Sequence, residues 1–279
     1  LTMTTNGTIT HAQAWSIMTL PDLSLAISFD GLPAVHDRHR CFRNGRGTAG
    51  VVEGTIRRLV GAGKPFRVAM VVRPDTLEHL PESLLYLRRL GVRRIEPSLD
   101  VWATWTEADI DRLEAIVAEC ATLWRDGLPH WSIGWFDQKA VELANLPHKR
   151  PLRCGFGDGE LTVTPAGRMY PCERLVGDDV VGNPMALPGN VMDGEDFINM
   201  PKSPGRTDEA CGACAMVGMC NTFCRCSNYV RTGDVRKPDA LLCRWNQVCL
   251  AETSRVLREA APAAPRNRME NNQPACAPT

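Results

Sequence analysis

The chain has 279 residues, of which 44% are hydrophobic, and its 32 basic and 32 acidic side chains give a formal net charge of zero. This composition supports a substantial apolar core and gives no electrostatic reason to expect nucleic acid or an anionic membrane as a partner. No apolar run approaches the roughly 20 residues that span a bilayer, and the first residues do not resemble a signal peptide. We therefore expect a cytoplasmic location, which leaves the 12 cysteines as the unusual feature.

The first half of the chain alternates apolar runs with helical patterns. Strands are predicted at 1–5, 23–28, 66–72 and 92–99, and helices at 50–59, 76–90 and 107–124. Thr106 and Asp109 form a weak capping box before the last of these helices. Strands that alternate with helices at this spacing indicate right-handed βαβ units and a parallel sheet, either open or barrel-like.

The composition changes near residue 147, where the alternation stops, glycine and proline become more frequent, and most of the cysteines follow. A final helix is predicted at 239–260, and the Pro/Ala/Asn-rich segment after it has no apolar period. We expect a first domain at 1–146, a second at 147–260 and a disordered tail at 261–279.

The cysteines of the second half are too dense to be explained by packing. Cys211-x2-Cys214-x5-Cys220-x3-Cys224 is followed closely by Cys226, so five thiols lie within sixteen residues. For the isolated Cys41 and Cys120 we expect ordinary burial. Disulfides fit poorly with an α/β chain that lacks a secretion signal. Thiolates suit either zinc or an iron–sulfur cluster, and the spacing alone favours iron–sulfur without excluding zinc.

With Cys154-x12-Gly167-x4-Cys172 upstream and Cys243 downstream, this pattern resembles the seven-cysteine signature of the SPASM domain. That domain is the C-terminal extension of radical S-adenosylmethionine (SAM) enzymes that modify peptides and proteins. The resemblance implies two auxiliary [4Fe–4S] clusters. Cys154, Cys172 and Cys224 would hold the first, and the second would be held by Cys211, Cys214, Cys220 and Cys243. The first cluster then has either an open iron or another ligand such as Cys226.

The first half resembles the same family. Thr5-Asn6-Gly7 is similar to the end of the third barrel strand, and Ser28-Phe29-Asp30-Gly31, with Arg40 following, is similar to the fourth strand and its loop. The resemblance implies that Ser28 and Arg40 contact SAM, whose amine and carboxylate suit a hydroxyl and a cation. It also implies an α/β fold, an incomplete (β/α)6 partial barrel followed by a Cys-rich SPASM domain with a small β-hairpin and a C-terminal helix.

The chain departs from the family pattern in one respect. It contains no C-x3-C-x2-C for a SAM-binding [4Fe–4S] cluster and no Gly-Gly-Glu-Pro-like segment. Both normally precede the third strand, so we expect the natural N-terminus to be missing and this chain to be inactive alone, although the complete protein would be an enzyme.

Two further features remain open. Glu173 follows Cys172, at a position where related sulfatase-maturating enzymes have an aspartate that accepts a proton. A salt bridge to Arg174 or a solvated carboxylate is the alternative. Five tryptophans lie between the two halves and are expected to pack the domain junction or, alternatively, to bind peptide: Trp102, Trp105, Trp124, Trp131 and Trp135.

The resemblance as a whole implies a radical SAM enzyme, similar to anaerobic sulfatase-maturating enzymes and ribosomal-peptide maturases, that abstracts hydrogen from a peptide or protein substrate. Its cofactors would be SAM and [4Fe–4S] clusters, and a flavodoxin or ferredoxin would donate electrons. The alternative is a non-catalytic iron–sulfur or zinc protein that presents a peptide to a partner enzyme.

Overall fold

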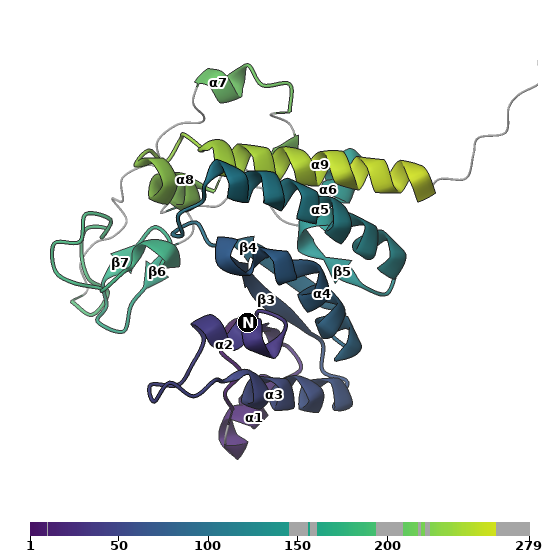
Figure 1. Ribbon diagram of the computed structural model, residues 1–279. Coiled ribbons are helices and arrows are strands. Elements are labelled where there is room, and N and C mark those ends of the chain that lie inside the picture. The colour runs from purple at the N-terminus through teal and green to yellow at the C-terminus, as the bar shows by residue number, and fades with distance from the viewer. Residues whose placement is uncertain are drawn as a thin grey trace, which may run out of the picture.

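The computed structural model describes residues 1–9, 11–144, 156, 161–193, 209–216, 219–220 and 224–260. Its main feature is a parallel sheet in which five strands follow one another in sequence order (Figure 1). The strands are β1 (Thr2–Thr5), β2 (Ser24–Ser28), β3 (Phe66–Val72), β4 (Arg94–Leu99) and β5 (Ser132–Ile133). Because every neighbouring pair is parallel, the carboxyl ends of all five strands lie at one edge. The predicted α/β class is confirmed.

Helices connect the successive strands, as parallel pairing requires. They are α1 (Ala12–Met18), α2 (Pro33–His39), α3 (Ala49–Gly61), η1 (Pro74–His79), α4 (Leu80–Arg89), α5 (Glu107–Gly127) and, after β5, α6 (Gly134–Leu143). The predicted capping box begins α5. The Asp109 N–H donates to the Thr106 hydroxyl, and the Thr106 N–H donates to the Asp109 carboxylate.

One apolar core lies between the sheet and its helices. Val68 and Ile95, on adjacent strands, and Leu59 of α3 are fully buried; burying such a side chain contributes about 1.5–3 kcal/mol. The opposite face of the sheet is less covered, since Ala69 on β3 and Ser98 on β4 are only half-buried. The sheet therefore has one apolar face under the helices and one face that is open to a site.

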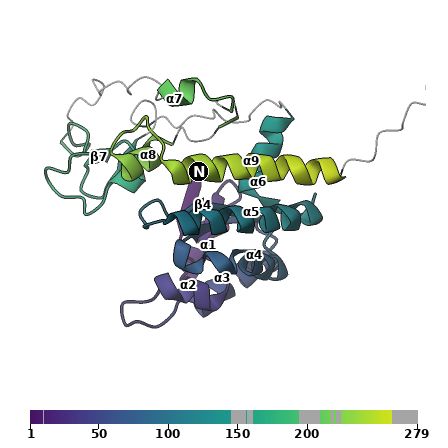
Figure 2. The same ribbon diagram turned by 45° about the horizontal axis from the view of Figure 1, so that its top comes forward.

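The second half adds a small unit and a long helix. Strands β6 (Thr162–Val163) and β7 (Met169–Tyr170) form an antiparallel hairpin, and η2 (Glu173–Leu175), α7 (Glu209–Gly212) and α8 (Arg225–Thr232) follow. The final helix, α9 (Ala240–Ala260), lies along α5 in both Figure 1 and Figure 2 and also contacts α6. It contributes to the main core through Leu241, Cys249 and Val256, so the last segment of the second half packs on the first.

The predicted strands agree with the structure to within two residues, and the one at 66–72 coincides with β3. The helix predicted at 76–90 differs, because it begins as the 3-10 segment η1 and becomes α-helical only at Leu80. Pro81 explains the change, since it has no N–H to donate to the carbonyl one turn earlier. The tail at 261–279 lies outside the described residues.

The five tryptophans predicted to pack the domain junction differ in how far they are buried. Trp105, Trp124, Trp131 and Trp135 are buried, whereas Trp102 is 65% exposed. Within the described ranges, no helix has both the length and the hydropathy needed to cross a membrane.

Candidate functional site

The carboxyl end of β2 carries the residues predicted to contact SAM. Ser28 ends the strand and is half-buried. Arg40 lies just after α2 and reaches back to Asp30, donating from Nε and Nη2 to the two carboxylate oxygens over 2.5 and 3.1 Å. Asp30 is buried and also accepts the Val71 N–H over 2.9 Å. The chain's own carboxylate thus fixes the guanidinium that was predicted to bind the cofactor's carboxylate.

A buried histidine holds the same loop. The Asp30 N–H donates to Nδ1 of His36 over 3.2 Å, so the ring proton resides on Nε2, which lies 3.0 Å from the Thr48 hydroxyl. That hydroxyl in turn donates to the Arg40 carbonyl over 2.7 Å. Burial lowers the pKa of His36 to about 4, against the opposing effect of the Asp30 carboxylate. The ring is therefore neutral at neutral pH, as this pattern of donors and acceptors requires.

A cavity of about 200 Å³ lies on the open face of the sheet, where β4 meets α6, α8 and α9. Trp135 and Trp245 form part of its wall, with ring centroids 5.6 Å apart in an edge-on arrangement. The polar side chains that line the cavity come from both halves of the chain and include Glu96, Ser98, Gln138, Arg174 and Ser227.

Arg174 links the sheet to the cysteine-rich unit across this cavity. Its Nη2 donates to the Ser98 hydroxyl on β4, and its Nη1 donates to the Ser227 hydroxyl on α8, each over 3.1 Å. The Ser227 hydroxyl donates in turn to Cys224 Sγ over 3.1 Å. A continuous set of hydrogen bonds thus runs from a sheet residue to a predicted cluster ligand. From the sequence, Arg174 was expected only as a salt-bridge partner for Glu173, and nothing local in the sequence indicates its long-range contacts.

Glu173, the predicted proton acceptor, opens η2 with an exposed side chain and is not among the residues that line the cavity. The residue next to it, Arg174, turns inward instead. The catalytic role of Glu173 remains a prediction.

Three thiols lie together where η2 meets α8. Cys224 and Cys226 have their sulfur atoms 3.3 Å apart, and Cys226 also hydrogen bonds to Cys172. The hydrogen bond from Cys226 lowers the pKa of Cys224 to about 5 and also lowers the pKa of Cys172. The same hydrogen bonds to Cys172 and Cys224, together with burial, raise the pKa of Cys226. Cys154, the other residue predicted for this cluster, lies outside the described residues.

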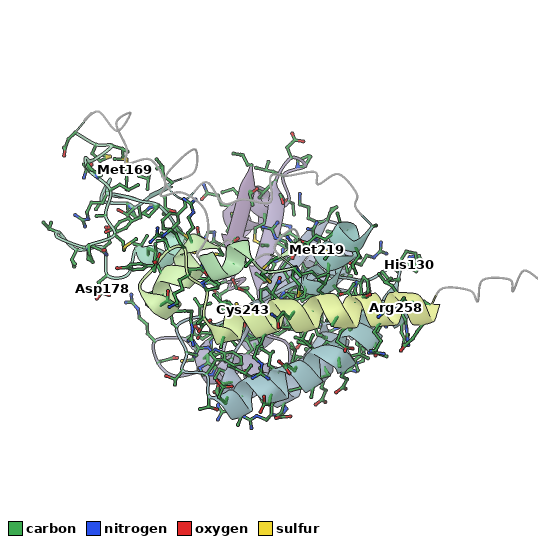
Figure 3. The ribbon with its side chains drawn as sticks, turned by 90° about the horizontal axis from the view of Figure 1, so that it is seen from above. His130, Met169, Asp178, Met219, Cys243 and Arg258 are labelled. Carbon is green, nitrogen blue, oxygen red and sulfur yellow. The ribbon has the colours of Figure 1, made fainter. Side chains whose placement is uncertain are left out.

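The cysteines predicted for the second cluster lie near the start of α9, where Cys243 is labelled in Figure 3. Burial raises the pKa of Cys243 to about 11, and the neighbouring Cys211 and Cys220, then Asp239 and Cys214, raise it further. The three other thiols predicted for this cluster are therefore within electrostatic reach of Cys243.

The remaining cysteines have other surroundings. Cys120 and Cys249 are fully buried in the main core, and burial raises the pKa of both thiols. The expectation of burial is confirmed for Cys120 and is wrong for Cys41, which is exposed. Cys41 lies in a short bridge to Gly47 on the loop after α2, where its side chain has no core to enter. Cys276 lies outside the described residues.

The donor chemistry suits an iron–sulfur cluster, because soft thiols are gathered in two places. Across the described ranges, no group of three or more His, Cys, Asp or Glu side chains is positioned to hold a single metal ion. A [4Fe–4S] cluster differs from such a site, because each of its thiolates binds a different iron.

No family model and no curated protein matches the chain. Solved structures do match its fold. The structure of anSMEcpe with bound AdoMet superimposes with a TM-score of 0.70 at 18% sequence identity, covering 93% of this chain and 71% of that one. Another anSMEcpe structure, with AdoMet and Kp18Cys peptide bound, gives a TM-score of 0.69 at 17% identity, covering 93% and 75%.

Streptococcus suis SuiB bound to its precursor peptide SuiA gives a TM-score of 0.54 at 15% identity, covering 86% of this chain and 58% of that one. The chain therefore spans little more than half the length of SuiB. Identities this low establish a shared fold, and the site has to be argued from its own residues.

Proposed function

We propose that this chain is part of a radical SAM enzyme that modifies a peptide or protein and carries two auxiliary [4Fe–4S] clusters. The observation that carries the proposal is the grouping of the cysteines. The seven-cysteine pattern assigns Cys172 and Cys224 to one cluster, and these two thiols share the hydrogen-bonding partner Cys226. It assigns Cys243 to the other cluster with Cys211, Cys214 and Cys220, and these interact with Cys243.

The sheet supports the finer fold assignment. Sequential parallel strands with one apolar face and one open face are consistent with an incomplete (β/α)6 barrel at 1–146. The hairpin, the cysteines and α9 would form the SPASM domain at 147–260. Because α9 packs on α5 and α6, we propose that this domain is rigidly joined to the sheet.

When bound, the auxiliary clusters would supply electron transfer or a binding site for substrate. The residues of the chain position them. Arg174 and Ser227 would hold Cys224 in place, and Arg174 adds positive charge beside a thiolate ligand. The cavity between β4, α6, α8 and α9 would receive part of the substrate against Trp135 and Trp245.

The AdoMet-binding role of Ser28 and Arg40 rests on the family resemblance and on the AdoMet present in structures of similar fold. Arg40 remains 30% exposed while Asp30 fixes it, which would leave guanidinium N–H groups for the carboxylate of SAM. The peptide partner is supported by anSMEcpe and SuiB, both solved with peptides bound. Glu173 as a proton acceptor, a flavodoxin or ferredoxin as electron donor and a cytoplasmic location complete the proposal.

Anaerobic purification followed by iron, sulfide and zinc analysis tests the metal assignment. We expect a brown chain with about eight irons and eight sulfides, four for each cluster. Cys214→Ala should lower the iron content, whereas Cys249→Ala, in the main core, should not. A colourless, zinc-loaded chain would contradict the proposal and favour a non-catalytic zinc protein that presents a peptide. Added SAM and reductant should yield 5′-deoxyadenosine only if a chain segment or partner supplies the C-x3-C-x2-C cluster.

A further inference from the structure

We propose that Cys226 is a ligand of the first auxiliary cluster, beside Cys172 and Cys224. This inference rests on the proposed function, since it requires that a cluster is bound at all. It goes beyond the seven-cysteine pattern, which contains no counterpart of Cys226 and assigns only three thiolates to this cluster, one of them Cys154, outside the described residues. A fourth thiolate would close the iron that the pattern leaves open.

The sulfur atom of Cys226 contacts two thiols that are predicted to bind the cluster. The sulfur of Cys226 lies 3.3 Å from that of Cys224, and it also hydrogen bonds to Cys172. Cys226 is therefore in contact with both described ligands of the predicted cluster, which lie more than fifty positions apart in the sequence. A thiol placed there only to fill space would have no reason to contact both.

The position of Cys226 in the fold also supports its role as a cluster ligand. It lies in the first turn of α8, two residues after the N-cap residue Cys224, so both thiols are held at the same helix end. Cys226 is 2% exposed and belongs to a small apolar cluster with Phe156 and Leu175. Cluster iron binds soft sulfur donors, and the Cys226 thiol would lose its proton on binding.

Binding of a cluster requires the side chains of Cys224 and Cys226 to move. Each thiolate of a [4Fe–4S] cluster binds a different iron, so Cys224 and Cys226 have to separate from their present contact. Both side chains turn about a single χ1 bond, and their backbone is fixed by α8. Staggered rotamers of cysteine therefore give the sulfurs room to separate without unfolding the helix.

Two other roles for Cys226 compete with this one. A disulfide with Cys224 would consume both thiols and exclude the cluster from them. A purely structural thiol would fill the apolar cluster around Phe156 without touching iron. The substitutions Cys226→Ala and Cys226→Ser distinguish these roles, and Cys249→Ala is the matched control because it also removes a buried thiol.

The experiment uses the full chain, purified anaerobically and reconstituted with iron and sulfide. We expect Cys226→Ala to lose about four of about eight irons, or to convert one cluster to a three-iron form visible by electron paramagnetic resonance (EPR) and Mössbauer spectroscopy. Cys226→Ser should retain iron with an altered EPR spectrum of the reduced cluster, because a serine oxygen can replace the sulfur. Cys249→Ala should match wild type. Circular dichroism verifies folding, and if the alanine variant fails to fold, the serine variant decides.

The outcomes separate the two proposals. If wild type holds two clusters and Cys226→Ser gives an unchanged EPR spectrum, the ligand assignment is overturned and the proposed function stands. If wild type holds no iron and sulfide, both are overturned. A disulfide between Cys224 and Cys226 in the loaded wild type, detected by peptide mass mapping, would also overturn the assignment.

Discussion

The Nζ of Lys139 donates to the carbonyl oxygen of Met219 over 2.7 Å and thereby ties α6 to the cysteine-rich loop. Lys139 also forms an ion pair with Glu142 at 2.9 Å, and both side chains are at most 3% exposed. Met219 immediately precedes Cys220, a predicted ligand of the second cluster. The position of that ligand therefore depends on a buried charge in the first half of the chain.

Replacing Lys139 by Met should strongly destabilise the chain. The substitution keeps an unbranched side chain that lacks only the ammonium group's reach, but it leaves Glu142 buried without its cation and Met219 without its donor. Breaking a buried pair in this way costs about 3–5 kcal/mol. The measurement is the free energy of unfolding in urea, together with the iron content of the reconstituted chain, which should fall as the loop around Cys220 loses its anchor.

The matched control for Lys139→Met is Arg57→Ala, which breaks an exposed pair with Glu53 on α3. An exposed pair of this kind contributes under about 1 kcal/mol. If the two variants lose similar stability, Lys139 is not the anchor that the geometry indicates.

Arg174→Gln should loosen α8 from the sheet. The arginine donates to Ser98 on β4 and to Ser227 on α8, and a glutamine amide cannot span both hydroxyls. Each hydrogen bond from a charged donor contributes about 1.5–3 kcal/mol. Hydrogen exchange should become faster at the amides of α8 and stay unchanged in β1 and β2. The control, Arg174→Lys, keeps the charge but has one nitrogen and should rescue only in part. Unchanged exchange in α8 would show that Arg174 is not a tether.

The fold could be predicted closely where local pattern and burial agree. The strand at 66–72 and the helix after Thr106 are examples, because alternation and a capping box are local signals. The short helix α2 was not predicted, since its seven residues carry no clear apolar period. Cys41 was expected to be buried because isolated cysteines usually are, but the loop it occupies has no core to cover it.

The sequence predicted the residue types of the candidate site but not the contacts between those residues. The cysteine spacing carries the metal chemistry, and Ser28 and Arg40 follow from the family resemblance. Asp30 was noted only as part of the segment that resembles the fourth barrel strand and its loop, yet it is the buried partner of Arg40. Arg174, Lys139 and the contact between Cys226 and Cys172 join segments far apart in the sequence, and such pairs have no signal in a single chain.

His36 should make stability depend on pH. Burial lowers the pKa of His36 from the ordinary value of 6.5 to about 4. Of its charged neighbours, Asp30 and Asp37 oppose this shift and Arg40 adds to it. Below about pH 6.5 the unfolded chain binds a proton that the folded chain does not, so the free energy of unfolding should fall as pH drops toward 5. His36→Asn removes the titrating ring and should flatten the dependence in that window. Parallel curves for wild type and variant from about pH 7 to pH 5 would contradict the assignment.

The metal-free chain gives an independent test of the three-thiol contact. With metal removed by a chelator under reducing conditions, the hydrogen bond from Cys226 lowers the pKa of Cys224 to about 5. Cys224 should then be a thiolate at neutral pH, and its rate of alkylation by iodoacetamide, followed by peptide mass spectrometry, should change little between about pH 6 and 9.

Cys226→Ala removes the donor and should shift the alkylation profile of Cys224 upward in pH, toward the value of about 8.5 for a free cysteine. The shift should stay incomplete, because Ser227 still donates to the sulfur and Arg174 still lies nearby. Cys249→Ala should leave the profile as in wild type. An alkylation profile of Cys224 that is the same with and without Cys226 would mean that the two sulfurs are not in contact in solution, and the structural basis for Cys226 as a ligand would then be lost.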